Sequence, residues 1–174
     1  MSHRRNNCVI FACPHDKHAL ASLHAATGLF RAVSEGLSIR QIAALPYRIE
    51  SKAKGEVSIL LVTSRDTGRW VLPKGNLMFG IAPHRAAARE AEEEAGVRGR
   101  IATKPLGRFP YRKWRSAKRF KLAKVVVFAL KVTKELESWK EQGQRERRWF
   151  PRDEAAKLVD EPKLRALILA AALS

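Results

Sequence analysis

The amino-acid sequence predicts an α/β sandwich, and three observations support this prediction. Apolar and β-branched segments that read as strands are intermixed with segments that read as helices. The strands are expected at 41–47, 57–63 and 122–132, and the helices at 83–95, 152–159 and 162–173. The first of these helices has Pro83 at its start and Gly96 directly after its end, which are the usual start and stop signals. The run 125–130 is apolar throughout, which suits a central strand. This order of elements is typical of helices packed against a sheet.

The remaining segments complete the expected domain. Gly55 marks 51–56 as a hairpin loop, and a glycine-bearing loop is expected after Pro73. Shorter or less regular strands are expected at 70–72, 101–112 and 147–150. The first forty residues are rich in small side chains, with a helix expected at 19–33. We therefore expect an N-terminal extension, 1–40, followed by one domain, 41–174.

Charge is the unusual property of the composition. The 174 residues hold 34 Lys and Arg against 17 Asp and Glu, which gives a formal net charge of +17. Such a field attracts polyanions: nucleic acid, an anionic membrane or a phosphate-rich small molecule. No apolar run approaches the ~20 residues that span a bilayer, and the first residues make a poor signal peptide. A cytoplasmic protein without a membrane partner is therefore expected.

The two cysteines, Cys8 and Cys13, are too few for a disulfide framework. They lie near His15 and His18, which raises the alternative of a zinc site. Four ligands crowded near one end of the sequence match none of the usual zinc spacings, however. We interpret the cysteines as reduced thiols.

The segment 89–96 carries an unusual concentration of carboxylates. On a helix, Glu90, Glu93 and Glu94 stand at i, i+3 and i+4, so their side chains share one face. Like charges at this spacing repel, and the C-terminal turns of a helix disfavour anions. A compensating cation is therefore expected, and clustered carboxylate oxygens suit Mg²⁺ or Mn²⁺. The alternative is a solvated acidic face that Arg89 partly neutralises from four residues before Glu93.

Around this helix the sequence resembles the Nudix hydrolase family. The family signature is Gly, five residues, Glu, seven residues, and then Arg-Glu-apolar-x-Glu-Glu-x-Gly-apolar. Read from Gly75, the spacing leads to Arg89 and Glu90 and ends at Gly96 and Val97. One position departs from it, because Ile81 stands where the signature has its first glutamate. Met78 stands where many members carry another acid.

The resemblance implies a fold and a set of roles. The fold is the Nudix α/β/α sandwich, with a mixed β-sheet and the loop and helix that carry the signature. Glu90, Glu93 and Glu94 would ligate Mg²⁺, and Glu93, Glu94 and Arg89 would serve catalysis. Gly75 and Gly96 would be structural. Ile81 leaves the number of metals open. The general base is also open, with four candidates: Glu135, Glu137, Glu141 and Glu154.

Further segments are similar to the diphosphoinositol polyphosphate phosphohydrolases and their bacterial relatives. These are 61–65, 94–99, Ser138-Trp139 and 145–150. The resemblance implies a diphosphoinositol or diadenosine polyphosphate substrate. It also implies phosphate-binding cations, because a substrate with many phosphates needs several of them. These would be Arg65, Lys74, Arg112, Lys113, Arg115, Arg145 and Arg147.

Other functions remain open from the sequence alone. Aromatic residues interrupt the basic segment 108–124, as on surfaces that bind single-stranded nucleic acid, and Trp114 is its best stacking candidate. One alternative is therefore pyrophosphohydrolysis at RNA 5′ ends or of a nucleoside diphosphate derivative. Another is a non-catalytic protein of this fold that binds nucleic acid. The oligomeric state is not predicted.

Overall fold

The structure, a computed structural model, describes residues 39–51, 55–116 and 119–174, and it describes no side chains at 39 and 112–121. These residues belong to one unit, Leu37–Ser174. The helix expected at 19–33 and the cysteine–histidine segment lie outside the described residues. No helix within the described ranges is long and apolar enough to cross a membrane.

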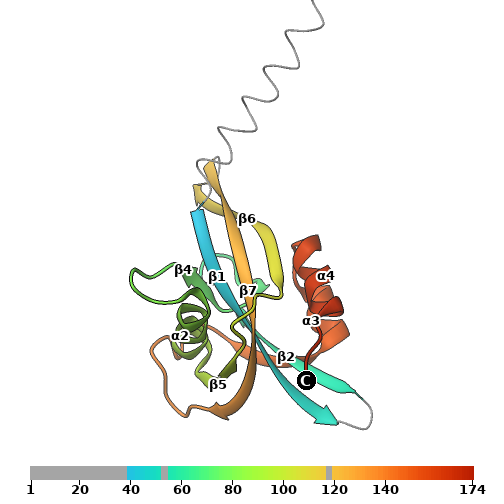
Figure 1. Cartoon of the computed structure of the whole chain (residues 1–174). Helices are drawn as coiled ribbons and strands as arrows, with labels where there is room; N and C mark the ends of the chain where they lie inside the picture. Colours follow the sequence, from blue (N-terminus) through green and yellow to red (C-terminus); the bar gives the residue numbers. More distant parts are fainter. Residues whose placement is uncertain (1–38, 52–54, 117–118) are drawn as a thin grey trace, which may run out of the picture. The chain divides into compact units, whose positions relative to one another are not determined.

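An eight-stranded sheet forms the middle layer (Figure 1). Its main path runs through β3 (Trp70–Val71), β2 (Glu56–Thr63), β1 (Ile39–Ser51), β7 (Arg119–Glu135) and β5 (Val97–Ile101). Off this path, β4 (Lys74–Asn76) pairs with β1, β6 (Gly107–Ser116) with β7, and β8 (Arg147–Pro151) with β2. The strands β1 and β7 are parallel, and the other pairs of these strands are antiparallel. The expected mixed sheet is confirmed.

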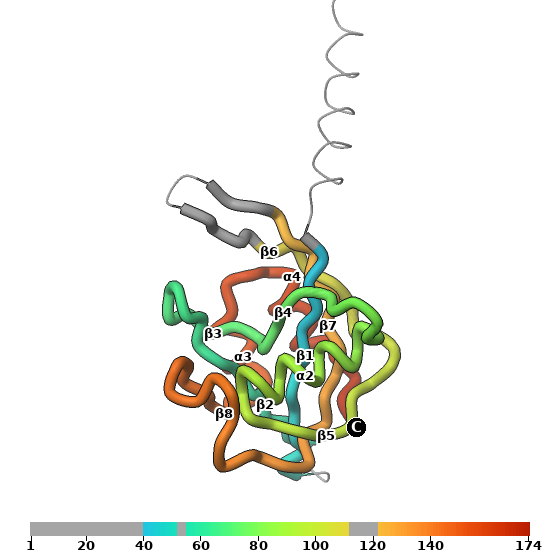
Figure 2. The backbone as a smooth tube through the Cα atoms, turned by 90° about the vertical axis from the view of Figure 1, so that its left-hand side faces the viewer, coloured from blue at the N-terminus to red at the C-terminus, as the bar shows by residue number. Residues whose placement is uncertain are grey.

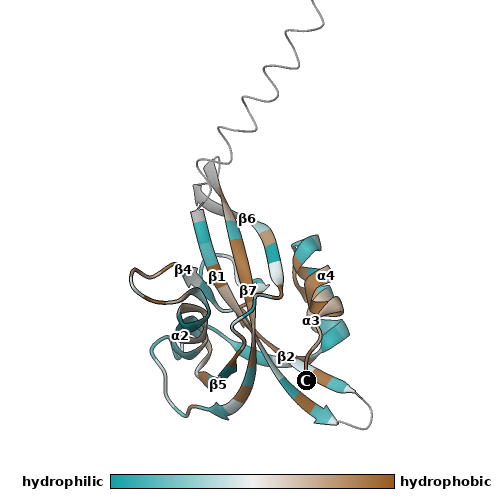
Figure 3. Ribbon diagram, viewed as in Figure 1, coloured by the Kyte–Doolittle hydropathy of each residue, from teal (hydrophilic) through white to brown (hydrophobic). Residues whose placement is uncertain are grey.

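Successive residues of the central strands face opposite helices. Ile42 of β1 lies in the core beneath α2 (Pro83–Ala95), whereas Ala43 lies in a second core with α3 (Arg152–Leu158) and α4 (Pro162–Ala170). This alternation follows from the two-residue period of a strand. Brown apolar stretches of β1 and β7 accordingly lie between the helix layers in Figure 3. The expected α/β/α sandwich is confirmed.

A face of alanines brings α2 close to the sheet. Its fully buried members are Ala86, Ala87, Ala91 and Ala95. Small side chains allow a close approach, and Figure 2 shows α2 in front of β1 and β7. The helix begins at Pro83 and is followed by Gly96, whose φ of 62° is left-handed and favours glycine. A Cβ on Gly96 would also lie 2.5 Å from the ring of Trp139. Both predicted boundaries are confirmed.

Other boundaries differ from expectation. The strand expected at 101–112 starts only at Gly107, as β6, because the chain leaves the sheet edge around Pro105, which has no N–H to donate to a ladder. The strand β5, which ends at Ile101, was not predicted. The chain rejoins the sheet at Gly107, where a Cβ would lie 2.5 Å from Leu167. The strand β4 lies inside the segment expected to be only a loop, and it pairs with the start of β1. The last helix ends at Ala170 rather than at residue 173.

Candidate active site

A cleft of about 310 Å³ adjoins the C-terminal half of α2. Its charged walls combine four carboxylates with four cations: Asp66, Glu90, Glu94, Glu141, Arg65, Arg69, Lys74 and Arg145. The other lining residues are Gln41, Ser64, Thr67, Gly75, Asn76 and Tyr111. The structure therefore brings together two of the three predicted metal ligands and three of the predicted phosphate-binding cations.

Two contacts fix the side chain of Glu94 in the last turn of α2. Its side chain is only 8% exposed, and its Oε1 lies 2.6 Å from Nη2 of Arg145. Its Oε2 accepts a hydrogen bond of 3.1 Å from the backbone N–H of Lys74. Burial raises the pKa of Glu94, while the charges of Arg145 and Lys74 act in the opposite direction. Both carboxylate oxygens are thus fixed in place.

Glu90 lies against Gly75 and has no hydrogen bond or ion pair within the described part of the chain. A Cβ on Gly75 would lie 1.9 Å from Oε1 of Glu90, so a larger residue here would displace the Glu90 carboxylate. Burial raises the pKa of Glu90 to about 7, with further contributions from the charges of Glu94 and Glu93. An unpartnered carboxylate next to other carboxylates is an environment that a bound cation would stabilise.

Glu93 points to partners that do not line the cleft. Its Oε1 lies 2.8 Å from Nε of Arg89, and its Oε2 lies 2.6 Å from Nζ of Lys140. Hydrogen bonds from Lys140 and then Arg89 lower the pKa of Glu93. Among the residues that the structure describes, no three His, Cys, Asp or Glu side chains are grouped as metal ligands. We attribute this to the pairing of Glu93 with Arg89 and Lys140.

The segment 136–146 carries charged residues from the end of β7 to the end of α2. Backbone hydrogen bonds attach it there, from Leu136 to the carbonyl of Gly96 at 2.7 Å and from Glu141 to the carbonyl of Glu93 at 3.1 Å. Its attachment explains how Lys140 reaches the helix. In Figure 1 it is the orange connection that passes near α2 and β5.

The structure separates the four candidates for the general base. Glu141 lines the cleft, whereas Glu135, Glu137 and Glu154 do not. Glu135 instead accepts a hydrogen bond of 3.0 Å from the indole of Trp149. Glu141 is therefore the candidate of the four whose position suits a role in the cleft.

The predicted phosphate-binding cations occupy different environments. Arg65 lines the cleft, is 57% exposed and lies 3.5 Å from Glu141. Lys74 also lines it, with Nζ 4.8 Å from the ring centre of Tyr111. Burial, followed by the charges of Arg145 and Arg69, lowers the pKa of Lys74, although Glu94 opposes the shift. Both cations are placed to meet an anion.

Arg147 lies outside the cleft lining and caps α2. Its Nη1 donates hydrogen bonds to the carbonyls of Ala95 at 2.7 Å and Gly96 at 3.1 Å. Its guanidinium also lies 4.1 Å from the ring centre of Trp139. Cations stabilise the C-terminal end of a helix, where unpaired carbonyls gather.

The other basic candidates lie on β6, outside the described side chains: Arg112, Lys113 and Arg115. Trp114, the predicted stacking residue, also lies on β6 outside the described side chains.

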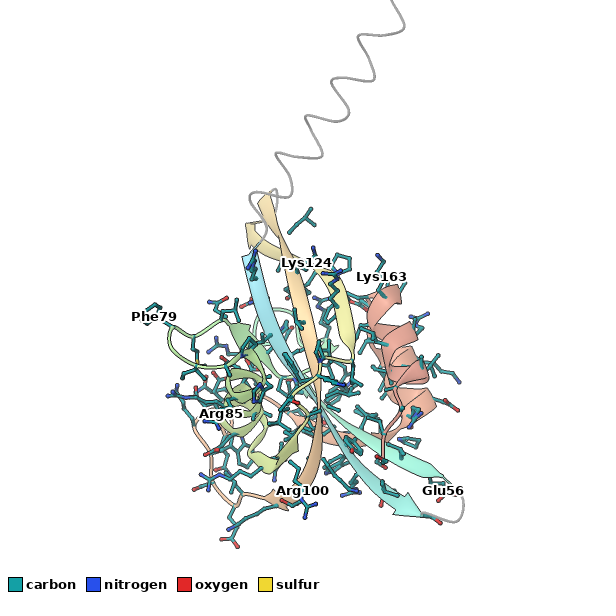
Figure 4. The ribbon with its side chains drawn as sticks, in the orientation of Figure 1. Glu56, Phe79, Arg85, Arg100, Lys124 and Lys163 are labelled. Atoms are coloured by element: carbon teal, nitrogen blue, oxygen red, sulfur yellow. The ribbon has the colours of Figure 1, made fainter. Side chains whose placement is uncertain are left out.

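The loop between β4 and α2 shows what replaces the missing signature acid. Ile81 and Met78 pack against the core beneath α2, so apolar contacts occupy these positions. The arginine of the signature, Arg89, pairs instead with Glu93. Phe79 extends from the same loop and is fully exposed (Figure 4).

Several residues at the site were not singled out from the sequence. Tyr111 and Gln41 line the cleft, and Lys140 pairs with Glu93. Gln41 reaches the wall because β1 pairs with β4, which places it opposite Asn76. A glutamine at the start of a strand carries no signal for such a role. Lys140 was one of many lysines in a basic chain.

Comparison with known proteins agrees with this architecture. The family described as NUDIX domain matches residues 40–170. Nudix hydrolase 12, mitochondrial, of Arabidopsis thaliana is 37% identical over 127 residues, which cover 66% of this chain and 63% of that protein. Diphosphoinositol polyphosphate phosphohydrolase 3-alpha of Mus musculus is 35% identical over 111 residues, covering 62% and 63%. The chain thus spans less than two thirds of the length of these two relatives.

A solved structure has the same fold at lower identity. The crystal structure of an Ap4A hydrolase from C. elegans superimposes with a TM-score of 0.54 and 19% identity, covering 76% of this chain and 94% of that one. The residues that match the NUDIX domain family, 40–170, include the whole of α2, the cleft lining and both helix layers. The chain belongs to the Nudix family.

Proposed function

We propose that this protein hydrolyses a diphosphate linkage in a phosphate-rich small molecule, in a reaction that depends on a divalent metal ion. One observation carries the proposal: the same cleft holds the carboxylates of Glu90, Glu94 and Glu141 and the cations Arg65 and Lys74. Carboxylates without neighbouring cations would bind a metal ion but no phosphate. Cations without carboxylates would bind an anion but no metal ion. Their combination suits a metal bound together with phosphates.

The donor set fits Mg²⁺ or Mn²⁺. Glu90, Glu93 and Glu94 would hold the ion through carboxylate oxygens, which these hard cations prefer. The half-buried carboxylate of Glu90, which has no partner among the described residues, supports this assignment. Glu93 joins the set once its side chain leaves Arg89 and Lys140. When bound, the ion supplies charge neutralisation at the phosphates and a more acidic water.

The side chains of the cleft have separate tasks in this proposal. Arg65 and Lys74 bind the phosphate oxygens and orient the linkage for attack. Glu94, fixed by two hydrogen bonds, keeps its remaining lone pairs directed at the reaction centre. Glu141 orients the attacking water. Water adds to phosphorus as the bridging P–O bond breaks, and two phosphorylated products leave.

A diphosphoinositol or diadenosine polyphosphate is the substrate class that we propose. The mouse relative is named for the first class and the nematode structure for the second. The four cations that line the cleft suit a substrate with several phosphates. The proposed location is the cytoplasm, although the Arabidopsis relative is named as mitochondrial.

The decisive experiment measures phosphate and nucleotide release with Mg²⁺ by the wild type and by Glu93→Gln. The substrates are a diphosphoinositol polyphosphate, diadenosine tetraphosphate, ADP-ribose and 5′-triphosphorylated RNA. Arg148→Lys serves as a matched control, because Arg148 is exposed and outside the cleft. We expect turnover of the first two, its loss in Glu93→Gln and its retention in Arg148→Lys. Preference for RNA would assign the protein to RNA 5′ ends instead of the proposed substrate class. No turnover of any substrate would refute the proposal.

A further inference from the structure

Arg145 makes contacts that use its whole guanidinium. Its Nη2 lies 2.6 Å from Oε1 of Glu94, and its Nε lies 2.6 Å from Oε2 of Glu141. Its Nη1 donates to the carbonyl of Thr63 at 2.9 Å, at the end of β2. Every nitrogen of the side chain therefore has a partner from the protein itself.

Burial restricts Arg145 further. Its side chain is 6% exposed, against 57% for Arg65 on the same cleft. A phosphate could reach the Arg145 guanidinium only by displacing Glu94 or Glu141, and displacing Glu94 would leave a buried carboxylate without its ion pair. Leaving a buried charge unpaired is strongly destabilising. Among the described residues, Arg65 pairs only with Glu141, at 3.5 Å, and Glu141 keeps Arg145 as a partner when Arg65 turns to a phosphate.

We propose that Arg145 is a positioning residue, which holds the carboxylates of Glu94 and Glu141 in their cleft orientations, while Arg65 contacts the substrate phosphates. This assignment rests on the proposed pyrophosphohydrolase function and revises the phosphate-binding role that the sequence suggested for Arg145. The bidentate reach of a planar guanidinium explains why arginine stands here, because an ammonium cannot hold two carboxylates and a carbonyl in one plane. The contact with Thr63 ties both carboxylates to the sheet.

The test compares Arg145→Lys with Arg65→Ala, using Arg148→Lys as the control from the same stretch of chain. Three quantities are measured for each protein: kcat, KM for diadenosine tetraphosphate, and the dissociation constant for Mn²⁺ by calorimetry without substrate. For Arg145→Lys we expect kcat and Mn²⁺ affinity to fall ~10- to 100-fold, as for other groups that orient metal ligands, with little change in KM. For Arg65→Ala we expect KM to rise roughly tenfold, the loss of one good charge-assisted contact, with Mn²⁺ affinity unchanged.

The outcomes separate the two proposals. A rise in KM for Arg145→Lys with unchanged kcat and Mn²⁺ affinity would make Arg145 a phosphate contact and overturn the assignment. Wild-type protein that binds Mn²⁺ but turns over no substrate refutes the proposed function, and the Mn²⁺ affinities alone then decide the role of Arg145. Wild-type protein that binds no Mn²⁺ overturns both. If Arg145→Lys does not fold, Glu141→Gln takes its place, because it removes one arm of the cluster with little change in volume. It is judged by the same criteria, with weaker Mn²⁺ binding at unchanged KM as the expected result.

Discussion

Lys140 holds the carboxylate of Glu93 at 2.6 Å, although 47 positions of sequence separate the two residues. The ion pair engages the one glutamate of the proposed metal site that does not line the cleft. Metal binding must therefore compete with Lys140 and with Arg89 for the same oxygens.

Replacing Lys140 should tighten metal binding. In Lys140→Met the competing ammonium is gone, and an exposed ion pair is worth up to about 1 kcal/mol, so we expect Mn²⁺ to bind up to roughly fivefold more tightly. Calorimetry at low ionic strength measures the change, and Lys134→Met on β7 is the control for lost surface charge. Unchanged or weaker binding in Lys140→Met would show that Lys140 does not compete with the metal.

Glu94 and Glu93 should differ in their contribution to stability. Glu94→Ala leaves the buried Arg145 with one carboxylate fewer, so we expect the free energy of unfolding to fall by about 3 kcal/mol. Glu93→Ala removes more exposed ion pairs and should cost less than about 1 kcal/mol. Urea denaturation of both metal-free variants measures these values. Equal losses would mean that the buried ion pair of Glu94 contributes no more to folding than the exposed pairs of Glu93.

Gly75→Ala should disturb Glu90 directly. The added methyl group would overlap the Glu90 carboxylate, so we expect weaker Mn²⁺ binding and a lower melting temperature. Glu90→Ala in the same chain removes the overlap, and the double variant should melt above Gly75→Ala alone. This reversal is a coupling between contacting residues. If the two changes instead lower the melting temperature additively, the close approach is absent in solution.

The metal-free protein should lose a stabilising contribution from Glu90 as the pH rises. Burial, with the charges of Glu94 and Glu93, raises the pKa of Glu90 from its ordinary 4.5 to about 7, so the folded state binds this proton more tightly than the unfolded state. The contribution is fully present below pH 4.5 and is lost as the pH passes through 7. Thermal melts of wild type and Glu90→Gln across this range measure it. The advantage of wild type over the variant should shrink with rising pH, and a constant difference would contradict the shift.

The local parts of this architecture could be predicted from the sequence, because their signals are local. Pro83 and Gly96 bound α2 in the sequence as they do in the structure. The period of a helix places Glu90 and Glu94 together, and both line the cleft. The continuous apolar run of β7 correctly indicated a central strand.

The rest depended on contacts between distant segments. No local pattern shows that Lys140 pairs with Glu93 or that Arg147 caps α2 rather than lining the cleft. Arg145 carried the same signal as any basic residue near a phosphate site. Its burial between Glu94 and Glu141 follows from the docking of the 136–146 segment, which spacing along the chain does not reveal. The break between β5 and β6 was also missed, although Thr103, Lys104 and Pro105 interrupt the apolar residues there.

The attachment of residues 136–146 to the end of α2 has a consequence for how relatives diverge. Lys140, Glu141 and Arg145 reach different partners from one short stretch, so an insertion or deletion within it would move all three at once. A replacement elsewhere in the cleft alters one contact at a time. A change in the length of this stretch is therefore expected to alter several contacts of the cleft together, while the sheet stays intact.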